Sequence, residues 1–262
     1  MTFGGGVAGD LGGFIAATWL RGIDYVQVPT SLEAAIDASI GGKTAINLRD
    51  GKNLVGAFHQ PVAVLVDTDY LTTLPERELV AGLAESVKHA AIRDADFVTW
   101  HEDHAARILA REPDVLAELI QRNCAIKAAV VEQDERESGL RVILNYGHTL
   151  GHAFEHLLSY ELRHGECVAL GILAENEIAC VRGSLRRDVA NRLHVLLERF
   201  GAPTRLPRRL PPAEVLAACE SDKKARRGRL RFVLLRALGQ PEIVEAPPAA
   251  EIEAGLEVIQ PG

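Results

Sequence analysis

The sequence predicts an α/β N-terminal part, residues 1–74, followed by an all-α C-terminal domain, residues 75–262. A glycine-rich segment at residues 4–10 and two short apolar runs bounded by turn residues are typical of a parallel sheet with helical connections. After Pro75 the pattern changes to long amphipathic or apolar helical segments. With 47% hydrophobic and 25% charged residues, the composition is that of a globular protein and excludes disorder as the main state.

The individual elements follow in order along the chain. Residues 11–21 suit a helix after the glycine-rich segment, and the apolar runs at 25–28 and 63–66 suit two buried strands. Further helices are expected at residues 77–89, 105–110, 114–134, 149–158 and 167–181. Another strand signal occurs at 230–235, and the small, acidic tail from Pro247 is expected to be peripheral.

Charge and cysteine usage limit the possible partners. The formal net charge is −7, and residues 204–236, although locally basic, are expected to form a solvated face with one or two anion-binding lysines. No apolar run reaches the roughly 18 residues of a membrane-spanning helix, and the N-terminus does not resemble a secretory signal. We therefore expect a cytoplasmic protein without nucleic-acid or membrane partners, whose four widely spaced cysteines are reduced thiols.

The glycine-rich segment 4–10 is typical of a strand-to-helix loop that binds a diphosphate, because glycines let the backbone approach the ligand closely. The alternative is a tight turn without a ligand. Such loops follow a strand, yet only three residues precede this one. The sequence therefore reads as if it began inside a domain, and we expect either a start assigned to an internal Met or a truncation.

A second pair of glycine-lysine segments, at residues 41–44 and 51–53, superficially resembles a P-loop. The complete P-loop pattern needs a glycine at position 37, where this chain has Asp37, so an ATP site is excluded. Lys43, Lys52 and Asn53 remain suited to contacts with anions.

Histidines provide the strongest chemical signal. His148 and His152 are four residues apart and lie on one face of a helix, and His164 precedes an apolar helix. Thr149 follows His148, so the zinc-protease pattern is absent, but two of these histidines and a carboxylate can form a catalytic metal site. Glu85, in an otherwise apolar helical stretch, is the candidate carboxylate. Its alternative role is a salt bridge with Lys88 or Arg77.

The charged run at residues 134–141 leads towards the histidines. Such a run is usually a solvated face. Because this one adjoins the histidine cluster, Glu137, Arg141 and Asn145 are candidates for the same cavity.

Six segments occur in the order found in a known family: GGGVAGDLGGFIAATWLRG, QVPTSLEAAIDASIGGKTAIN, GKNLVGAFHQP, LPERELVAGLAESVKH, DERESGLRVILNYGHTLGHAFE and RHGECVALG. Over residues 4–171 the chain resembles the 3-dehydroquinate synthases. The resemblance implies an incomplete Rossmann-like NAD-binding domain and a helical metal- and substrate-binding domain. It also implies NAD and a divalent metal, Zn²⁺ or Co²⁺, as cofactors. The implied reaction converts 3-deoxy-D-arabino-heptulosonate 7-phosphate to 3-dehydroquinate and phosphate, in the shikimate pathway.

The same resemblance assigns roles to individual residues. The implied metal ligands are Glu85, His148 and His164. The implied NAD contacts are Gly5, Gly6, Val7, Gly9, Asp10, Thr30, Ser31, Asp37, Lys43, Lys52, Leu71, Thr72 and Thr73. The implied catalytic and substrate-facing residues are Lys43, Asn53, Lys88, Lys127, Glu137, Arg141, Asn145, His152, Asp37 and one of Lys223 and Lys224. Arg21 is implied to reach the active site of a neighbouring subunit in a homodimer.

Three other functions remain open at this point. A related sugar-phosphate cyclase would make another cyclitol from an anionic sugar phosphate. A metal-dependent polyol dehydrogenase tends to carry Asp where this chain has Glu85, and it would show net redox turnover. The family pattern also includes a long stretch before the glycine loop, so an inactive fragment that pairs with another polypeptide is the third alternative.

Overall fold

The computed structural model describes residues 1–48, 51–136, 139–225, 230–245 and 247–262, without the side chains of residues 51, 52 and 222–225. The chain forms two units, each built from two separate stretches: unit 1 from residues 1–83 and 106–138, and unit 2 from residues 84–105 and 139–262. Helices α3 (Glu76–Arg93) and α4 (Ala95–Leu109) each run from one unit into the other. The units are thus discontinuous in sequence, and the expected division after residue 74 stays a prediction.

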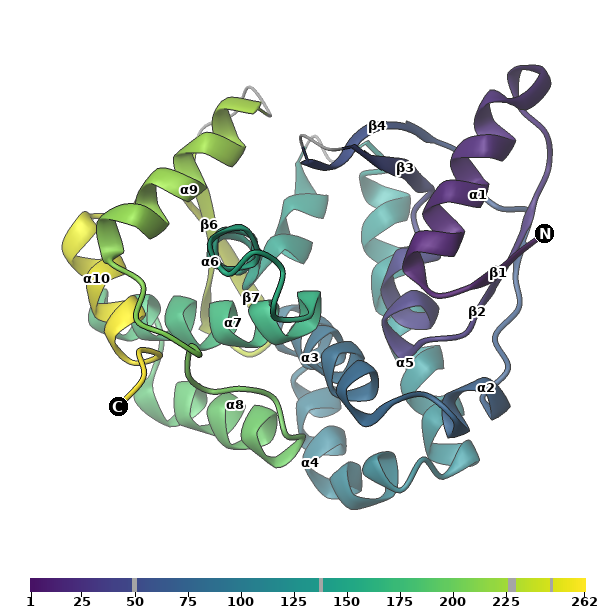
Figure 1. The fold of residues 1–262 in the computed structure, drawn as a ribbon. Helices are drawn as coiled ribbons and strands as arrows, with labels where there is room; N and C mark the ends of the chain where they lie inside the picture. The colour runs from purple at the N-terminus through teal and green to yellow at the C-terminus, as the bar shows by residue number, and fades with distance from the viewer. Residues whose placement is uncertain (49–50, 137–138, 226–229, 246) are drawn as a thin grey trace. The chain divides into compact units, whose positions relative to one another are not determined.

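Unit 1 contains a three-stranded parallel sheet of order β1-β2-β5. Its strands are β1 (Thr2–Gly4), β2 (Val26–Pro29) and β5 (Ala63–Val64). Strands β1 and β2 are labelled in Figure 1. The two strands expected from the apolar runs are confirmed, and the three residues before the glycine loop add β1. Helix α1 (Gly6–Thr18) and the turn η1 (Trp19–Arg21) connect β1 to β2, since parallel strands need such a crossover.

Glycines bring α1 close to its neighbours. A Cβ at Gly12 would lie 2.1 Å from Thr2 Cγ2, and one at Gly13 would lie 2.5 Å from Thr44 Cγ2. Only glycine fits at these distances, so part of the glycine signal reflects helix–strand packing. Helix α1 also carries exposed apolar side chains spaced four residues apart, Val7, Leu11 and Ile15, and the exposed Trp19 of η1 continues this spacing.

The remaining part of unit 1 includes an antiparallel hairpin that the sequence did not predict. Strands β3 (Lys43–Leu48) and β4 (Gly51–Phe58) pair with Lys43 opposite Phe58. Gly41 and Gly42 have φ of +100° and +64° and turn the chain directly into β3. A P-loop would lead into a helix, so the exclusion of an ATP site agrees with this geometry. The other elements of unit 1 are η2 (Ala34–Ala38), α2 (Asp69–Thr72) and α5 (Pro113–Gln133).

Unit 2 is built around α7 (His164–Val181), whose residues 165–176 are all buried. A helix that is apolar on nearly all sides belongs in the centre of a bundle. Around it lie η3 (Leu140–Asn145), α6 (His148–Leu157), α8 (Arg187–Arg199), α9 (Pro212–Ala225), α10 (Ala249–Glu257) and the strands β6 (Arg231–Ala237) and β7 (Gln240–Glu245) (Figure 1). The helices expected at 149–158 and 167–181 are confirmed as α6 and α7.

Two expectations for this unit were wrong. The C-terminal part is not all-α, because β6 and β7 form an antiparallel hairpin. Residues 232–235 of β6 are all buried and pack beside α7, which explains the apolar run seen in the sequence. The C-terminal tail is not peripheral either, because α10 packs on α7. A Cβ at Gly255 would lie 2.6 Å from the carbonyl oxygen of Ala174, and Ile252 and Leu256 are buried.

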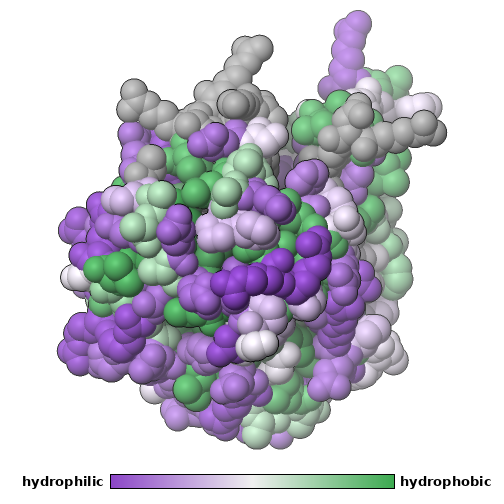
Figure 2. Space-filling model, turned by 60° about the vertical axis from the view of Figure 1, so that its left-hand side comes forward, coloured by the Kyte–Doolittle hydropathy of each residue, from purple (hydrophilic) through white to green (hydrophobic). Residues whose placement is uncertain are grey.

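On the face shown in Figure 2, hydrophilic residues cover most of the surface, and hydrophobic residues lie between them in small groups. This mixture is ordinary for a protein surface. Among the described residues, none of the helices combines the length and apolar character needed to cross a membrane.

Candidate metal centre and nucleotide site

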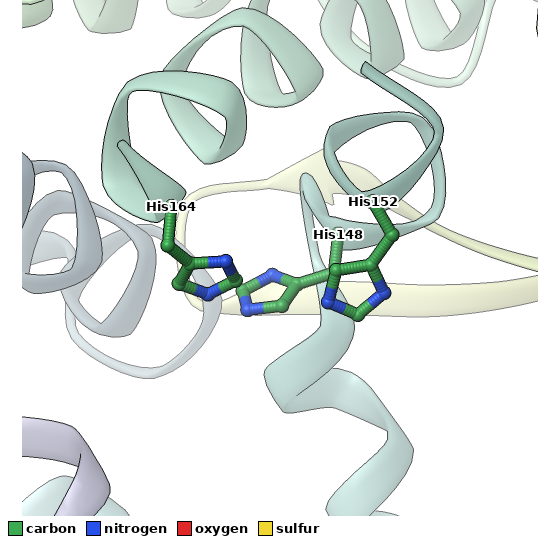
Figure 3. A group of neighbouring side chains, drawn as sticks. All are labelled: His148, His152 and His164. Carbon is green, nitrogen blue, oxygen red and sulfur yellow. The ribbon is translucent and has the colours of Figure 1, made fainter. Parts of the chain in front are cut away.

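Three helices of unit 2 bring one carboxylate and two imidazoles together. Glu85 lies in the middle of α3, His148 is the first residue of α6 and His164 is the first residue of α7. Nε2 of His148 is 3.5 Å from Glu85 Oε1, and Nε2 of His164 is 3.2 Å from the same oxygen. The ring centroids of the two histidines are 5.1 Å apart, and Figure 3 shows the rings side by side. The spatial convergence expected from the sequence is therefore present.

The hydrogen bond between His148 and Tyr146 fixes the tautomer of the neutral imidazole and therefore which ring nitrogen has a lone pair. Its Nδ1 is 3.0 Å from the carbonyl oxygen of Tyr146, which can only accept a proton, so Nδ1 carries the hydrogen. Burial lowers the pKa of His148 well below its ordinary value, while Glu85 opposes this shift. Burial thus favours the neutral ring, in which Nε2 has a lone pair and can serve as a ligand atom.

This donor set fits a divalent cation. Two imidazole nitrogens and an anionic oxygen converge on one point, which is the ligand chemistry that Zn²⁺ prefers in catalytic sites. Lone pairs at such distances repel one another unless a proton or a cation lies between them. Glu85 is completely buried, and a buried carboxylate requires a compensating positive charge.

Lys88 provides part of this compensation. Its Nζ is 2.5 Å from Glu85 Oε2, and the two side chains are 1% and 0% exposed. The salt bridge considered as an alternative role for Glu85 thus exists together with the histidine contacts. One carboxylate oxygen contacts the ammonium group, and the other contacts the imidazoles.

His152 completes a group of three histidines with His148 and His164, whose ring nitrogens lie within 4.8 Å of one another (Figure 3). Its ring is edge-on to His148, at 5.4 Å, and stacked on His164, at 5.8 Å. A three-histidine site is therefore the alternative to the set that contains Glu85. His152 is only half-buried, whereas Glu85 is fully buried and carries the negative charge that a dication needs.

The first turn of α6 is held by a residue that the sequence analysis missed. Glu175 is fully buried in α7 and accepts the N–H of Gly147 at 2.7 Å through Oε2. Burial raises the pKa of Glu175 well above its ordinary value, and backbone N–H groups at the start of α6 oppose the shift. An acidic residue inside an apolar helix, the same signal that identified Glu85, could have revealed it.

A backbone contact also fixes the crossing of α6 and α7. A Cβ at Gly171 would lie 1.9 Å from the carbonyl oxygen of Gly147, so the two helices touch where neither has a side chain. Gly147 itself has φ of +79°, a conformation that favours glycine. The position of His148 relative to α7 is therefore set by backbone atoms.

The expected substrate-facing residues of unit 2 occupy different environments. Arg141, in η3, is 2% exposed, and Asn145 at the end of η3 is half-buried. Lys88 is paired with Glu85, as described above. Glu137 and the side chains of Lys223 and Lys224 lie outside the described residues.

In unit 1 the glycine loop forms the start of α1. Gly5 is the N-cap residue and contributes no side chain, and Gly4, Gly5, Gly6 and Gly9 line a small crevice beside β2. The first-turn N–H groups of a helix point outward and favour an anion. The loop geometry thus suits a diphosphate, although a Cβ at Gly9 would also meet Gln27 at 2.7 Å, so packing explains this glycine equally well.

Other residues expected at the nucleotide have partners within unit 1. Thr30 donates its N–H to the carbonyl oxygen of Gly4 at 2.9 Å, which ties β2 to the glycine loop. The side chain of Leu71 is 1% exposed, and the carbonyl oxygens of Leu71 and Thr72 accept hydrogen bonds from Arg111. Any contact of Leu71 with a ligand would therefore use its backbone. Val7, Thr72 and Thr73 are exposed, and Thr30 and Ser31 are half-buried.

Three charged residues of unit 1 form a cluster. Nζ of Lys127 lies 2.8 Å from Asp37 Oδ1 and donates to the carbonyl oxygen of Asp37 at 2.6 Å. Burial raises the pKa of Asp10 to about 6, while Lys127 lowers it and Asp37 raises it. The structure thus brings these three predicted residues together.

Lys43 and Asn53 lie on the hairpin beside a cavity of about 340 Å³, which Asp10 also lines. Asn53 has φ of +55°, in the left-handed region of the backbone map. Asn tolerates this conformation, whereas a β-branched residue would be strained in it. The side chain of Lys52 lies outside the described residues. Arg21, which also has a positive φ of +70°, is exposed.

Comparison with solved structures defines the class of protein. ValA, the 2-epi-5-epi-valiolone synthase of Streptomyces hygroscopicus subsp. jinggangensis with NAD⁺ and Zn²⁺ bound, is 31% identical with a TM-score of 0.92, over 98% of this chain and 72% of that chain. A 2-deoxy-scyllo-inosose synthase complexed with carbaglucose-6-phosphate, NAD⁺ and Co²⁺ is 30% identical with a TM-score of 0.89, over 98% and 73%. The fold is that of the sugar-phosphate cyclases.

Sequence comparison defines the family within this class. The model of the 3-dehydroquinate synthase N-terminal family matches residues 1–81, and that of the C-terminal family matches residues 82–225. The 3-dehydroquinate synthase of Desulforamulus reducens is 48% identical over 98% of this chain and 72% of its own length. The chain belongs to the 3-dehydroquinate synthase family.

Proposed function

We propose that this chain converts 3-deoxy-D-arabino-heptulosonate 7-phosphate to 3-dehydroquinate and phosphate, as an NAD- and metal-dependent carbon–oxygen lyase. The convergence of Glu85, His148 and His164 carries the proposal, because it brings together the ligand types of a divalent metal in a chain of this family. The 48% identity to a 3-dehydroquinate synthase, against 30–31% to cyclases that make other products, favours this reaction over the related ones.

In this proposal the two cofactors divide the chemistry. When bound, NAD⁺ takes and returns a hydride, and a Zn²⁺ or Co²⁺ ion polarises the substrate hydroxyl, as such ions generally do. Glu85, His148 and His164 hold the metal. The glycine loop of unit 1 holds the diphosphate of NAD, and Asp10, Thr30, Ser31, Asp37 and residues 71–73 line the rest of that site.

The remaining side chains act on the substrate itself. Lys43, Asn53, Lys127 and Arg141 are suited to its carboxylate and phosphate, and the guanidinium of Arg141 suits bidentate pairing with a carboxylate. Lys88 partly compensates the negative charge of Glu85 by pairing with its Oε2. His152, next to both metal-binding rings but half-exposed, is placed to transfer a proton to the leaving phosphate.

The proposal also covers the roles of the two domains, the assembly of the protein and its location. Residues 1–74 form the Rossmann-like part that binds NAD, and residues 75–262 bind metal and substrate. The chain acts as a homodimer in which Arg21 contributes to the partner's active site, and it works in the cytoplasm.

The test combines turnover with metal binding. The purified chain, with Zn²⁺ or Co²⁺, NAD⁺ and the heptulosonate phosphate, should release phosphate and form 3-dehydroquinate without accumulating NADH. Steady accumulation of NADH would identify a polyol dehydrogenase instead, and a different cyclitol from another sugar phosphate would identify a related cyclase.

Two variants test the ligand set separately from turnover. Glu85→Ala should lose the metal, whereas His152→Ala should keep it at full occupancy and lose activity. The reverse pattern of metal content would assign the site to the three histidines and remove Glu85 from it.

A further inference from the structure

The second ligand histidine has a carboxylate on its outer side. Glu155, in α6, is 6% exposed, and its Oε2 lies 3.4 Å from Nδ1 of His164. Nε2 of the same ring faces Glu85 Oε1 at 3.2 Å. His164 thus lies between two carboxylates, one at each ring nitrogen.

We propose that Glu155 is a positioning residue for His164, holding the proton of His164 on Nδ1 and thereby directing the Nε2 lone pair to the metal. The inference rests on the proposed function, because it assumes that Glu85, His148 and His164 bind a divalent cation. A neutral imidazole carries one proton, and a metal can bind only the nitrogen without it. A carboxylate on the outer nitrogen selects the tautomer that ligation needs.

The two ligand histidines therefore differ in the charge of their outer partners. The outer partner of His148 is the neutral carbonyl of Tyr146, at 3.0 Å, whereas that of His164 is an anion. An anionic acceptor makes the imidazole a stronger electron donor than a neutral acceptor does. In this proposal the affinity for metal therefore depends on the charge of Glu155, which lies 3.4 Å from Nδ1 of His164.

One helix supplies both a ligand and this outer partner. Glu155 follows His148 by seven residues, which is two turns of α6, so both lie on the same face of the helix. Helix α7, which begins with His164, crosses α6 at the contact between Gly147 and Gly171. A single rigid helix pair therefore fixes the ligand atoms together with the carboxylate that orients one of them.

The experiment uses the full chain with its metal removed. The affinities of the wild type, Glu155→Gln and Glu155→Ala for Zn²⁺ are measured by competition with a chelator, and Co²⁺ is added to record its visible absorption spectrum. Loss of an outer-shell partner costs roughly 10–100-fold in metal affinity. We expect about 10-fold for Glu155→Gln, which keeps an acceptor oxygen without the charge, and up to about 100-fold for Glu155→Ala, with a changed Co²⁺ spectrum.

Glu166→Gln is the matched control. Glu166 is 8% exposed, lies two residues after His164, and accepts the N–H of Arg163 at 2.7 Å. This variant removes a buried carboxylate near the site but should leave metal affinity within about twofold of the wild type, because no ligand loses its outer partner. Thermal unfolding of the metal-free proteins tests whether each variant is folded, and Glu155→Gln, the smaller change, keeps the proposal testable if Glu155→Ala does not fold.

The outcomes separate this inference from the proposed function. Wild-type affinity and an unchanged Co²⁺ spectrum in Glu155→Gln would overturn the role of Glu155 and leave the metal site intact. An equal loss of metal affinity in Glu166→Gln would also overturn it, because removing any buried negative charge near the site would then have the same effect. If the wild type binds neither Zn²⁺ nor Co²⁺, the metal site of the proposed function fails, and this inference fails with it.

Discussion

The contact between Gly171 and Gly147 gives the sharpest expectation for a single substitution. Gly171→Ala places a Cβ 1.9 Å from the carbonyl oxygen of Gly147, where real Cβ atoms are found no nearer than 3.0 Å. The obstructing atom belongs to the backbone, so no side chain can rotate away. Helices α6 and α7 must separate locally by about 1.1 Å, the difference between these distances.

The expected magnitude follows from two opposing effects. Ala is favoured over Gly inside a helix by about 1 kcal/mol, so without the clash the variant would be more stable. Overpacking of a dense interior costs about 1–3 kcal/mol, and occasionally more. Because the obstructing atom belongs to the backbone, we use the upper end of about 3 kcal/mol, from which the gain of about 1 kcal/mol is subtracted. We expect a net loss of about 2 kcal/mol in the free energy of unfolding, or a melting temperature lower by several degrees.

The same displacement acts on function. It moves His148, next to Gly147, relative to His164 on α7, and a misplacement of about 1 Å can reduce catalysis by about 100-fold. The assays are denaturant unfolding, chelator competition for Zn²⁺ and steady-state turnover. Gly151→Ala is the matched control, since its Cβ would meet the carbonyl oxygen of Cys167 at 3.1 Å, a contact that small adjustments relieve. Equal stability and metal affinity in the two variants would refute the argument.

Two further expectations concern the charged cluster of unit 1. Burial raises the pKa of Asp10 from 3.8 to about 6, so the folded state binds a proton more strongly than the unfolded state. The free energy of unfolding contributed by this group therefore falls as pH rises from about 4 to 6. Asp10→Asn should therefore stabilise the protein more at pH 8 than at pH 4 in denaturant titrations; an equal effect at both values would contradict the shift. Lys127→Met should destabilise the protein by about 1–3 kcal/mol, less than for a fully buried pair because the Asp37 side chain is 25% exposed. Lys127→Met should also raise the pKa of Asp10 further, which carbon NMR can follow. The control removes the exposed Arg122, which pairs with Glu118. It should change stability by less than about 1 kcal/mol and leave the pKa of Asp10 unchanged.

The candidate metal centre was largely accessible from the sequence. His148 and His164 were marked by their spacing and flanking glycines, and Glu85 by its position in an apolar helix, since a buried carboxylate needs a partner. The structure brings all three to one point. Glu155 was not accessible, because it matters only through its contact with His164 across α6 and α7, which local patterns do not encode. Glu175 carries the same local signal as Glu85, an acidic residue inside an apolar helix.

The fold was predicted less completely for a similar reason. The parallel strands of unit 1 and the helices α6 and α7 carry strong local signals. The hairpin of β3 and β4 was missed because its glycines and lysines were interpreted as an anion-binding loop. The sequence of the tail predicts a peripheral segment because small residues such as Gly255 are typical of loops. In the structure the absence of a side chain at Gly255 permits close packing of α10 on α7.

The two carboxylate oxygens of Glu85 contact different partners, and this affects how many of them can bind a metal ion. With Oε2 contacting the ammonium group of Lys88 at 2.5 Å, only Oε1 is directed towards the histidines, so the carboxylate is arranged to coordinate through a single atom. In the proposed site Glu85, His148 and His164 would supply three protein donor atoms and would leave coordination positions for substrate oxygens. A Lys88→Met change would free Oε2 for a second contact with the ion and would thereby reduce the room for the substrate.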